Sequence, residues 1–366
     1  MTVTKGTRKL VVLVLALASP LAFAEYPVEV VEGSESDIVF YTSLEYNGGG
    51  MPTIAYGNRT ASEVRLATKS ADSTWSRETV APVEPQNLDH AIDSNGNILV
   101  CYTTRENPTY ALYVAERVGG TWSRTRVARA IKSLVVSCAY GPGHVASVVY
   151  ADSSKVYLAK RSGSTWSSEV VAQKVSVGVE TSLAYDLSGK PAIAFVDDRR
   201  KNGVGSTYLK LARKPGSKWS IEQAASSSNL IRHASLVFAP LGGGPMISYS
   251  PVPIGMPVAT YLATSPATGM WVSELIANAY GRSLAVDAGD TLYIGLSVVS
   301  LPKQVFFSSK APGGLWMPEV LETGPDDAGY IVPSTALDPT GHPAFSYGCR
   351  TDGYSFYDLR FASWVP

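Results

Sequence analysis

Charged residues recur at one position of an internal repeat, and they are the first candidates for chemistry in this chain. When strand-like segments that end near an aromatic residue are aligned on one another, that position carries Arg59, Arg105, Asp152, Asp198 and Arg350. A guanidinium group is a planar fork of donors that matches a carboxylate or a sulfate. The three arginines therefore predict a shared site for an anionic group. The alternative is three solvated arginines in surface ion pairs.

Further polar residues lie near these positions and extend the candidate set for ligand binding. Arg199 follows Asp198 directly, Arg232 and His233 begin the fifth repeat, and Tyr354 lies on a long loop near the C-terminus. His233 stands where a general base would be placed. The remaining histidines fall in short turns or in a column otherwise filled mainly by leucine: His144, His342 and His90. No catalytic residue is assigned from this set.

Strand-like segments that would position these residues recur along the whole chain. Seven tryptophans stand 44 to 53 residues apart, at Trp75, Trp122, Trp166, Trp219, Trp271, Trp316 and Trp364. A short segment of one pattern precedes each of them, beginning at Val64, Leu112, Val156, Leu209, Thr260, Val305 and Leu359. This period is typical of β-propellers. The sequence therefore predicts an all-β fold, a seven-bladed β-propeller.

The unit from Thr181 to Ala224 shows how one blade is built. It contains four short alternating segments joined by turns, the first two of them separated by a Ser-Gly turn. Successive side chains of a strand point to opposite faces. Large residues such as Leu183 and Phe195 fall on one face, and alanines and serines fall on the other. Such a sheet is expected to pack its large face against the small face of a neighbouring copy.

The last blade lacks an outermost strand of its own, because the sequence stops directly after the seventh tryptophan. Near the N-terminus, the segment Tyr26-Pro-Val-Glu29 matches the outer-strand segment Trp166-Ser-Ser-Glu169, with Tyr in place of Trp. We expect this N-terminal strand to complete blade seven and close the ring. Closure would remove exposed sheet edges, which promote aggregation.

The first 24 residues predict export. Lys5, Arg8 and Lys9 precede an apolar run that is too short to span a membrane permanently, and Ala22-Phe-Ala24 has the small residues of a cleavage site. We expect residues 1–24 to be a signal peptide and residues 25–366 to form one propeller domain, secreted or periplasmic and without membrane insertion.

The composition excludes one class of partner. Lys plus Arg and Asp plus Glu both number 31, and charged residues make up only 17% of the chain. A phosphate backbone requires a basic surface, so nucleic acid is not an expected partner. The expected partner is an extracellular glycan or protein, bound by a monomer.

The turn that precedes each tryptophan resembles the Asp-box (BNR) turn of secreted bacterial sialidase-type propellers, S-x-D-x-G-x-T-W. Ser70-Ala-Asp72-Ser-Thr74-Trp75 keeps four of its residues but is one position short, and Ser162-Gly-Ser-Thr165-Trp166 lacks the aspartate. The other turns keep only Gly or Trp. The resemblance extends to all seven blades in the order of their strands. It therefore implies the fold and says little about an activity.

The arginines are also reminiscent of the triad with which sialidases hold a sugar carboxylate. Sialidases have six blades and an Arg-Ile-Pro motif that this chain lacks, and no Tyr nucleophile with a Glu partner is assigned. Tyr354, Tyr357, Glu180 and Tyr330 lie on suitable loops. Seven-bladed polysaccharide lyases offer a second resemblance, in which His or Tyr abstracts a proton beside a uronate carboxylate neutralised by Arg.

Two repeated residue types have alternative roles. The tryptophans could stack on sugars or pack between blades, and packing is the commoner use. The turn aspartates Asp93, Asp186, Asp287 and Asp338 could bind calcium or cap their own turns, and capping is again the favoured role. The sequence has no metal-ligand cluster, phosphate-binding glycine loop or nucleophile elbow, so neither a metal nor a cofactor is expected.

Three cysteines remain, an odd number for an exported protein. Cys101 and Cys138 fall on faces of blades two and three that should meet, so a disulfide and two buried thiols are both open. Cys349 lies next to Arg350 and would be left over.

The long irregular loops all fall on one face of the expected propeller, which we call the loop face. They follow the second strand of a blade, and function usually lies on such variable loops. We therefore expect an exported module that binds an extracellular ligand, an acidic glycan above all, through the loop face. The alternatives are a carbohydrate-active enzyme, as a hydrolase or a lyase, and a protein-interaction scaffold.

Overall fold

The computed structural model describes residues 26–33, 37–131, 135–242, 244–253, 258–265, 269–298, 301–325, 329–350 and 357–365. The expected signal peptide (1–24) and Tyr354 lie outside these ranges. Among the described residues, no helix is long and apolar enough to cross a membrane. The only helical segment within those ranges is a single 3-10 turn at Pro142–His144.

The described strands form seven antiparallel sheets. Blade one contains β2 (Ile38–Tyr46), β3 (Pro52–Asn58), β4 (Glu63–Lys69) and β5 (Trp75–Ala81). Blade two contains β6 (Asn87–Ile92), β7 (Ile98–Glu106), β8 (Thr109–Val118) and β9 (Thr121–Ile131). Blade three contains β10 (Ser137–Gly141), β11 (Val145–Ala151), β12 (Lys155–Ser162) and β13 (Thr165–Gln173). Blade four contains β14 (Val177–Tyr185), β15 (Pro191–Asp198), β16 (Thr207–Arg213) and β17 (Ser220–Ser227).

The remaining blades follow the same order. Blade five contains β18 (Leu230–Phe238), β19 (Pro245–Val252), β20 (Thr260–Thr264) and β21 (Val272–Ala277). Blade six contains β22 (Tyr280–Val286), β23 (Leu292–Val298), β24 (Gln304–Lys310) and β25 (Met317–Thr323). Blade seven contains β26 (Gly329–Tyr330), β27 (Ser334–Leu337), β28 (Pro343–Arg350), β29 (Asp358–Ser363) and, from the N-terminus, β1 (Val28–Glu32).

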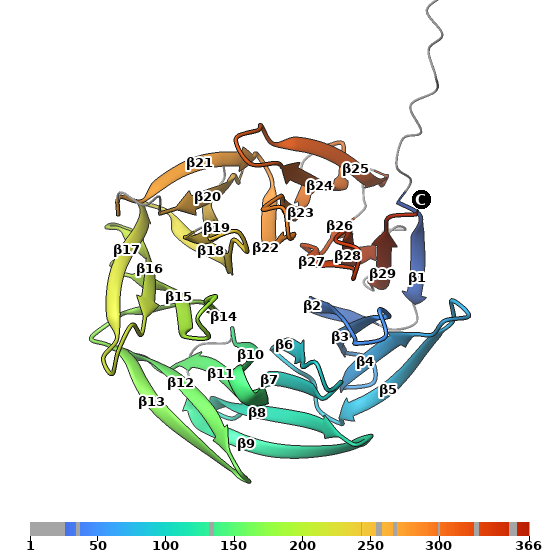
Figure 1. Ribbon diagram of the computed structural model, residues 1–366, viewed down its shortest axis with the longest axis horizontal. Coiled ribbons are helices and arrows are strands. Elements are labelled where there is room, and N and C mark those ends of the chain that lie inside the picture. The colour runs from blue at the N-terminus through green and yellow to red at the C-terminus, as the bar shows by residue number, and fades with distance from the viewer. Residues whose placement is uncertain are drawn as a thin grey trace, which may run out of the picture.

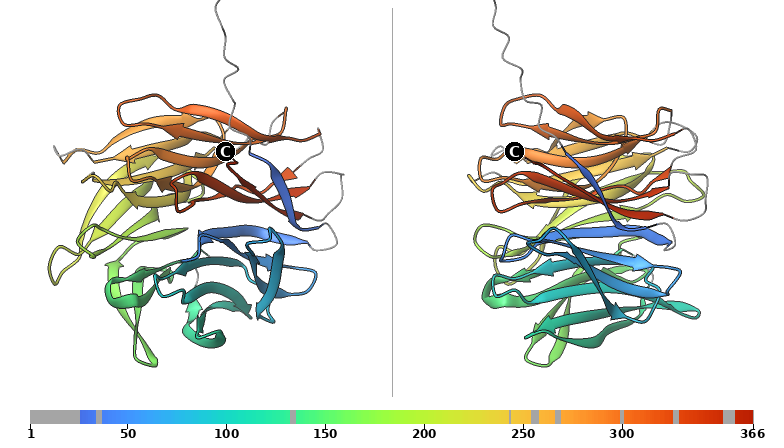
Figure 2. Two further views of the ribbon diagram at one scale, coloured as in Figure 1. Left: turned by 45° about the vertical axis from the view of Figure 1, so that its right-hand side comes forward. Right: turned by 90° about the vertical axis from the view of Figure 1, so that its right-hand side faces the viewer.

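The blades are arranged around one axis, with the first strand of each innermost (Figure 1). Consecutive strands pair in order from the axis outward, which confirms the predicted seven-bladed propeller. The predicted closure is also confirmed. Strand β1 pairs with β29 in the register Val28 to Ala362 and Glu29 to Phe361. Figure 2 shows this N-terminal strand lying against the C-terminal blade.

The core consists of the seams between neighbouring blades, as the two-faced pattern predicts. Leu183 and Phe195 on the large face of blade four pack with the small face of blade three in one cluster. Ala192 and Ala194 on the small face of blade four pack with Tyr249 and other large residues of blade five. Each fully buried large side chain contributes about 1.5–3 kcal/mol. Every seam therefore depends on both of its blades.

Tryptophans strengthen several seams through a shared glutamate. The indole Nε1 of Trp75 donates to Glu29 of the preceding blade (3.0 Å), and Lys69 pairs with the same carboxylate. Trp122 repeats this arrangement with Glu78, and Trp316 repeats it with Glu274. These rings are therefore used between blades, which is the packing role favoured by the sequence.

Turn aspartates cap their own backbones on the face opposite the loops. The carboxylate of Asp186 accepts hydrogen bonds from the backbone N–H groups of Ser188 and Lys190 (2.9 and 2.8 Å). Asp338 does the same with Thr340 and His342 (2.8 and 2.9 Å). Because these oxygens are already used, the capping role is the one that the geometry supports.

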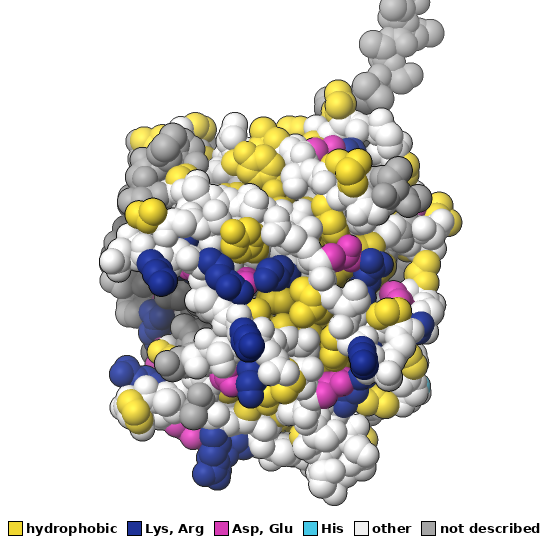
Figure 3. Space-filling view, turned by 90° about the vertical axis from the view of Figure 1, so that its left-hand side faces the viewer, with side chains coloured by type: hydrophobic (Ala, Val, Ile, Leu, Met, Phe, Trp, Pro, Cys, Tyr) yellow, Lys and Arg dark blue, Asp and Glu magenta, His cyan; other side chains and the backbone are white. Residues whose placement is uncertain are grey.

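Charges on the outer side of the ring are mixed with neutral groups. Figure 3 shows the side formed by β17 and its neighbours, where Lys and Arg side chains stand among white and yellow ones with acidic groups between several of them. This view shows no continuous basic band, which agrees with the balanced composition.

Candidate functional site

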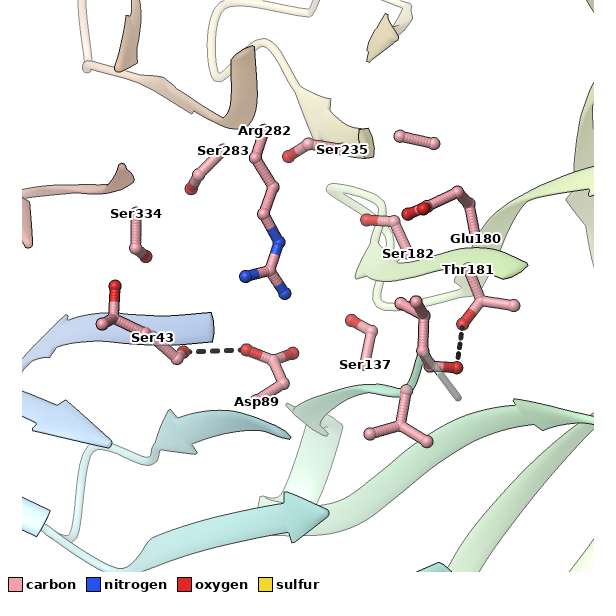
Figure 4. A pocket seen from close by; sticks show the side chains of 14 residues that line it. Ser43, Asp89, Ser137, Glu180, Thr181, Ser182, Ser235, Arg282, Ser283 and Ser334 are labelled. Atoms are coloured by element: carbon pink, nitrogen blue, oxygen red, sulfur yellow. Dashed lines mark hydrogen bonds between the residues drawn. The ribbon is translucent and has the colours of Figure 1, made fainter. Parts of the chain in front are cut away.

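An axial cavity of about 100 Å³ lies where the innermost strands of the blades meet. Its lining comes from every blade and is mostly polar (Figure 4). Serines make up part of the lining. Most of the other lining residues come one or two positions before one of these serines in the sequence, among them Thr42, Glu180 and Arg282. Since each innermost strand starts from the loop face, the cavity extends toward that face. We call this set of residues the axial site.

Serines hold one repeat position around the axis. They are Ser43, Ser137, Ser182, Ser235, Ser283 and Ser334. Most accept a hydrogen bond from a backbone N–H of the next blade: Leu183 to Ser137 (3.2 Å), Leu236 to Ser182 (3.0 Å), Leu284 to Ser235 (3.1 Å), Leu44 to Ser334 (3.1 Å) and His90 to Ser43 (3.2 Å). Ser283 instead donates to the Thr335 carbonyl (3.2 Å). This ring joins the blades at the axis.

Blade two replaces the serine with an acid. Asp89 has the same structural role as the serines, because its Oδ2 accepts a hydrogen bond from the backbone N–H of Cys138 (2.9 Å) in blade three. Its Oδ1 accepts from the Ser43 hydroxyl (2.8 Å). Burial raises the pKa of Asp89, against the lowering effects of its hydrogen bonds and of the Arg282 charge. A carboxylate therefore faces the cavity where the other blades present hydroxyls.

Arg282 is the cation of the axial site. Strand β22 has a register shift between Gly281 and Leu284, and such a bulge re-aims the side chains beside it. The guanidinium carbon lies 4.4 Å from the centre of the Tyr41 ring. Figure 4 shows the side chain extending across the cavity toward Ser43 and Asp89. Among the described residues, its Nη1 is buried and has no hydrogen-bond partner.

Glu180, Arg232 and His233 lie beside this cation. Glu180 is only 5% exposed, and burial raises its pKa to about 7, although Arg282, the His233 backbone and Arg232 all lower it. His233 has a φ of 57° and packs its ring edge-on against Tyr280, with 6.0 Å between the ring centres. Burial first, and then the charges of Arg282 and Arg232, lower the pKa of His233 to about 3. His233 is therefore neutral at physiological pH, and Glu180 titrates there.

The structure thus brings together two of the candidates predicted from sequence, Arg232 and His233, with Glu180. It adds Arg282 and Asp89, which the sequence analysis missed. The signal for both was present, because the first strands share a serine at one repeat position, and this serine is replaced only in blade two, by Asp89. Among the residues that precede this position in the seven blades, Arg282 is the only charged one.

The three arginines predicted to form an arc lie at the loop-face ends of second strands, in blades one, two and seven. Arg59 pairs with Asp37 (3.0 Å) and Glu84 (3.2 Å). The Nε of Arg105 donates to Asn107 (2.8 Å). Arg105 lies within β7, which runs to Glu106, and β8 begins at Thr109, so the loop that follows the second strand of blade two is short and not long as expected. The guanidinium carbon of Arg350 lies 5.6 Å from the centre of the Tyr357 ring.

One of the two acidic residues assigned to the shared repeat position does not occupy it. Asp152 lies two residues after Tyr150, whereas Asp198 lies three residues after Phe195. The rings of Tyr150 and Tyr157 stack as those of Tyr102 and Tyr113 do, so Tyr150 fixes the register of blade three. Asp152 therefore stands one position earlier than was predicted. It caps its own turn by accepting from the backbone N–H groups of Ser154 and Lys155.

The remaining candidates of blade four have local partners. Asp198 forms a two-point ion pair with Arg200 (2.9 and 3.0 Å). Arg199 pairs with the buried Asp197 (3.0 Å). Both candidates thus have charged partners close by in the chain, and Arg199 also donates to the Lys174 carbonyl (3.1 Å).

One group of possible metal ligands is present among the described residues, although none was expected. The ligand atoms of Asp89, Cys101 and Cys138 all lie within 4.8 Å of one another. Asp89 and Cys101 lie opposite each other on β6 and β7 of blade two, and Cys138 joins them where blades two and three pack, so no ligand spacing marks the three residues in the sequence.

Comparisons with known proteins support the architecture. No protein-family model matches the chain, and no curated protein matches it significantly. Among solved structures, a polysaccharide lyase of family PL25, an ulvan lyase bound to -[GlcA(1-4)Rha3S]-, is 12% identical, with a TM-score of 0.64 over 92% of this chain and 94% of that one. A Dyadobacter fermentans protein of unknown function is 13% identical, with a TM-score of 0.56 over 92% and 98%.

A third solved structure is the α-L-arabinofuranosidase Arb93A from Fusarium graminearum, which is 11% identical, with a TM-score of 0.52 over 93% of this chain and 96% of that one. At these identities the likeness shows the fold alone. The chain is a seven-bladed β-propeller similar in fold to several glycan-active proteins.

Proposed function

We propose that this protein binds an acidic glycan outside the cytoplasm, as a monomer, with a carboxylate or sulfate of the glycan received by Arg282 in the axial site. A cavity of about 100 Å³ has the volume of a few water molecules, so it accepts one charged group of a sugar. The sugar ring would remain at the loop face. The expected signal peptide is the basis for the extracellular location.

The observation that carries this proposal is the unmatched guanidinium. Arg282 presents a buried Nη1 that has no hydrogen-bond partner among the described residues, in a cavity lined by hydroxyls. A buried donor without a partner costs about 1–3 kcal/mol, and an anionic ligand would supply the missing acceptor. Tyr41 holds the guanidinium plane from one side. The serine hydroxyls around it are suited to the remaining oxygens of the anion.

The local charges favour an anion under mildly acidic conditions. Arg282 and Arg232 are both cationic and act electrostatically on Glu180. When Glu180 is protonated, Asp89 is the only carboxylate that lines the described cavity. The lining charges of Arg282 and Asp89 then balance, and Arg232 beside the cavity makes the local charge positive. Electrostatic attraction would therefore add to the hydrogen bonds from Arg282.

Calorimetric titration of the Arg282→Gln variant tests this proposal. Hexuronate and sulfated oligosaccharides are titrated against their neutral counterparts. We expect the variant to lose about tenfold to a hundredfold in affinity for the acidic sugar, because a hydrogen bond to a charged group contributes about 1.5–3 kcal/mol. Arg213→Gln is the matched control, since Arg213 ends β16 on the opposite face and pairs with Glu222 (2.6 Å). Equal binding by both variants would refute the proposal.

Glu180 supports a second candidate, a carbohydrate-active enzyme. A buried carboxyl with a pKa of about 7 is in the range of a general acid or base, and Arg282 beside it could neutralise a uronate carboxylate. The structural neighbours include a lyase and an arabinofuranosidase, so this fold can carry such reactions. Incubation with acidic polysaccharides, followed by assays for unsaturated products and new reducing ends, separates the two candidates. Activity that disappears in Glu180→Gln would favour the enzyme.

A further inference from the structure

Two thiols from neighbouring blades meet beside the axial site. Cys101 lies on β7 of blade two and Cys138 on β10 of blade three, and their sulfur atoms lie within 4.8 Å of each other. The two side chains belong to one apolar cluster together with Leu99 and Val148. Cys101 is fully buried and Cys138 is 5% exposed. Neither thiol is placed to meet a large partner from outside.

Ordered contacts fix the position of Cys138. Its backbone N–H donates to Asp89 Oδ2 (2.9 Å), and its thiol donates to the Asp89 carbonyl (3.4 Å). A second carbonyl, that of Leu99, lies 3.9 Å from the same sulfur. Strand β10 is thus held against β6 and β7 at this point. Formation of a bond to Cys101 requires the two sulfur atoms, which lie within 4.8 Å, to approach to about 2.05 Å.

We propose that Cys101 and Cys138 form a disulfide that joins blades two and three at the axial site. The two thiols lose two protons and two electrons, and a low-molecular-weight disulfide such as oxidised glutathione accepts them and becomes two thiols. One cysteine attacks the reagent and releases one thiol. The other cysteine then displaces the second thiol from the mixed disulfide, so that one S–S bond is broken and one is formed.

A metal is a poorer occupant of this position. Asp89 already accepts from the Ser43 hydroxyl and from the Cys138 backbone through its two side-chain oxygens. A metal would have to displace these bonds and would obtain three ligands from the group. The disulfide leaves both hydrogen bonds of the carboxylate intact.

Burial sets the time at which the disulfide forms. Desolvation raises the pKa of both thiols, so few thiolates exist in the folded protein. We expect the bond to form while the chain folds in an oxidising compartment. It would form slowly, if at all, once the reduced protein has folded. The third cysteine, Cys349, is buried in the blade seven region beside Glu322 and is left as a thiol.

Peptide mapping tests the disulfide directly. The full chain is expressed with export, alkylated without reduction under denaturing conditions, digested and examined by mass spectrometry. We expect one peptide pair linked through Cys101 and Cys138, with Cys349 alkylated. Three alkylated cysteines, a bond to Cys349, or stoichiometric zinc together with unlinked thiols would each overturn the proposal. This result does not depend on glycan binding, so it stands apart from the proposed function.

A stability measurement adds a matched control. Reduction of the exported protein should lower its melting temperature by roughly 5 °C, because the bond constrains the unfolded chain. Cys349→Ala should keep this sensitivity to reduction, and Cys138→Ala should lose it. If Cys138→Ala does not fold, the peptide map of the unaltered protein still decides the question. An equal response of Cys349→Ala and Cys138→Ala would contradict the inference.

Discussion

The axial site and the predicted arginine arc use the same residue type on the same face, yet they differ in how their charges are satisfied. Arg282 has a buried Nη1 without a hydrogen-bond partner among the described residues. Arg59, by contrast, has two carboxylate partners, and Arg105 has an amide partner, whereas Arg350 of the same arc has a buried Nε without a hydrogen-bond partner among the described residues. A guanidinium that is already paired has less to gain from a ligand. The comparison teaches that partners decide which arginine is available, and repeat position alone does not.

The distance from the axis explains part of this difference. First strands lie innermost, and second strands lie one strand farther out, about 4.8 Å on average. Side chains of the first strands can therefore meet across the axis, as Arg282 and Asp89 do in the lining of one cavity. Side chains at the ends of second strands have neighbours in their own blade and in the connections between blades, as Arg59 has in Asp37 and Glu84. Local pairing, as in Arg199 with Asp197, follows from that position.

The largest effect should come from opening the ring, because both regions depend on closure. Strand β1 supplies Glu29 to Lys69 and Trp75, and Val31 to the core between blades seven and one. Deletion of residues 25–32 should lower the free energy of unfolding by several kcal/mol, since pairing and apolar burial are lost together. Chemical denaturation of the truncated mature chain measures this.

A chain that keeps its stability and solubility without β1 would contradict this account of closure. The same truncated chain should lose acidic glycan binding, because the axial cavity takes Thr42 and Ser334 from the two blades that flank the opened seam. Glu29→Gln is a milder companion variant, since it weakens the pairs with Lys69 and Trp75 but leaves the strand in place.

The second-largest effect should be a pH dependence of the affinity for an anionic ligand, which we expect if the ligand binds at the axial site and not if it binds at the arginine arc. The pKa of Glu180 is raised to about 7 by burial, so the carboxyl is neutral below that pH and anionic above it. An anionic ligand should therefore bind about threefold to tenfold more weakly as the pH rises from 6 to 8. His233 has a pKa lowered to about 3 and stays neutral throughout. Titrations at several pH values measure the slope.

Glu180→Gln provides the control for this slope, because it removes the titrating group and should give a flat profile. A second readout has the same origin. The folded pKa of Glu180 lies above its ordinary value, so the folded protein binds the extra proton and should lose stability as the pH rises from about 4.5 through 7. Glu180→Gln should lose less over that interval. A slope that persists in the variant would assign the effect to another group.

Much of the fold could be predicted from the sequence, because its signals are local and repeated. The tryptophan period gave the blade count, and the match of Tyr26–Glu29 to Trp166–Glu169 indicated the closure that β1 provides. Arg232 and His233 could be found as well, since they begin a strand at the loop face. These features depend on sequence spacing, which a chain displays directly.

The axial site could be predicted only in part. Serines at the axis were counted as small packing residues, although their hydroxyls accept bonds from the next blade. Bulges before Thr181, Ser235 and Leu284 turn the preceding residues toward the axis, and strict alternation does not reveal such shifts. The error at Asp152 has another origin, since β11 is paired without a register shift and Asp152 stands two residues after Tyr150, whereas the shared position is the third. Contacts across the axis and between blades arise only in the closed ring, so the spacing of residues in the sequence does not show them.

The smallest effect should come from the arginine arc, and it decides between the two regions. Alanine at Arg59, Arg105 or Arg350 should weaken acidic glycan binding by about tenfold each if the three guanidinium groups share one anion. We expect about threefold or less for Arg59 and Arg105, because Arg59 pairs with Asp37 and Glu84 and Arg105 donates to Asn107. The largest effect within the arc should come from Arg350, whose buried Nε has no hydrogen-bond partner among the described residues. Titration of each variant beside Arg213→Ala, on the opposite face, measures the difference.

Tenfold losses in all three variants, with binding retained in Arg282→Gln, would move the anion from the axis to the arc. Small losses in the arc and a large one at Arg282 would mean that the second-strand arginines surround the ligand without holding its charge.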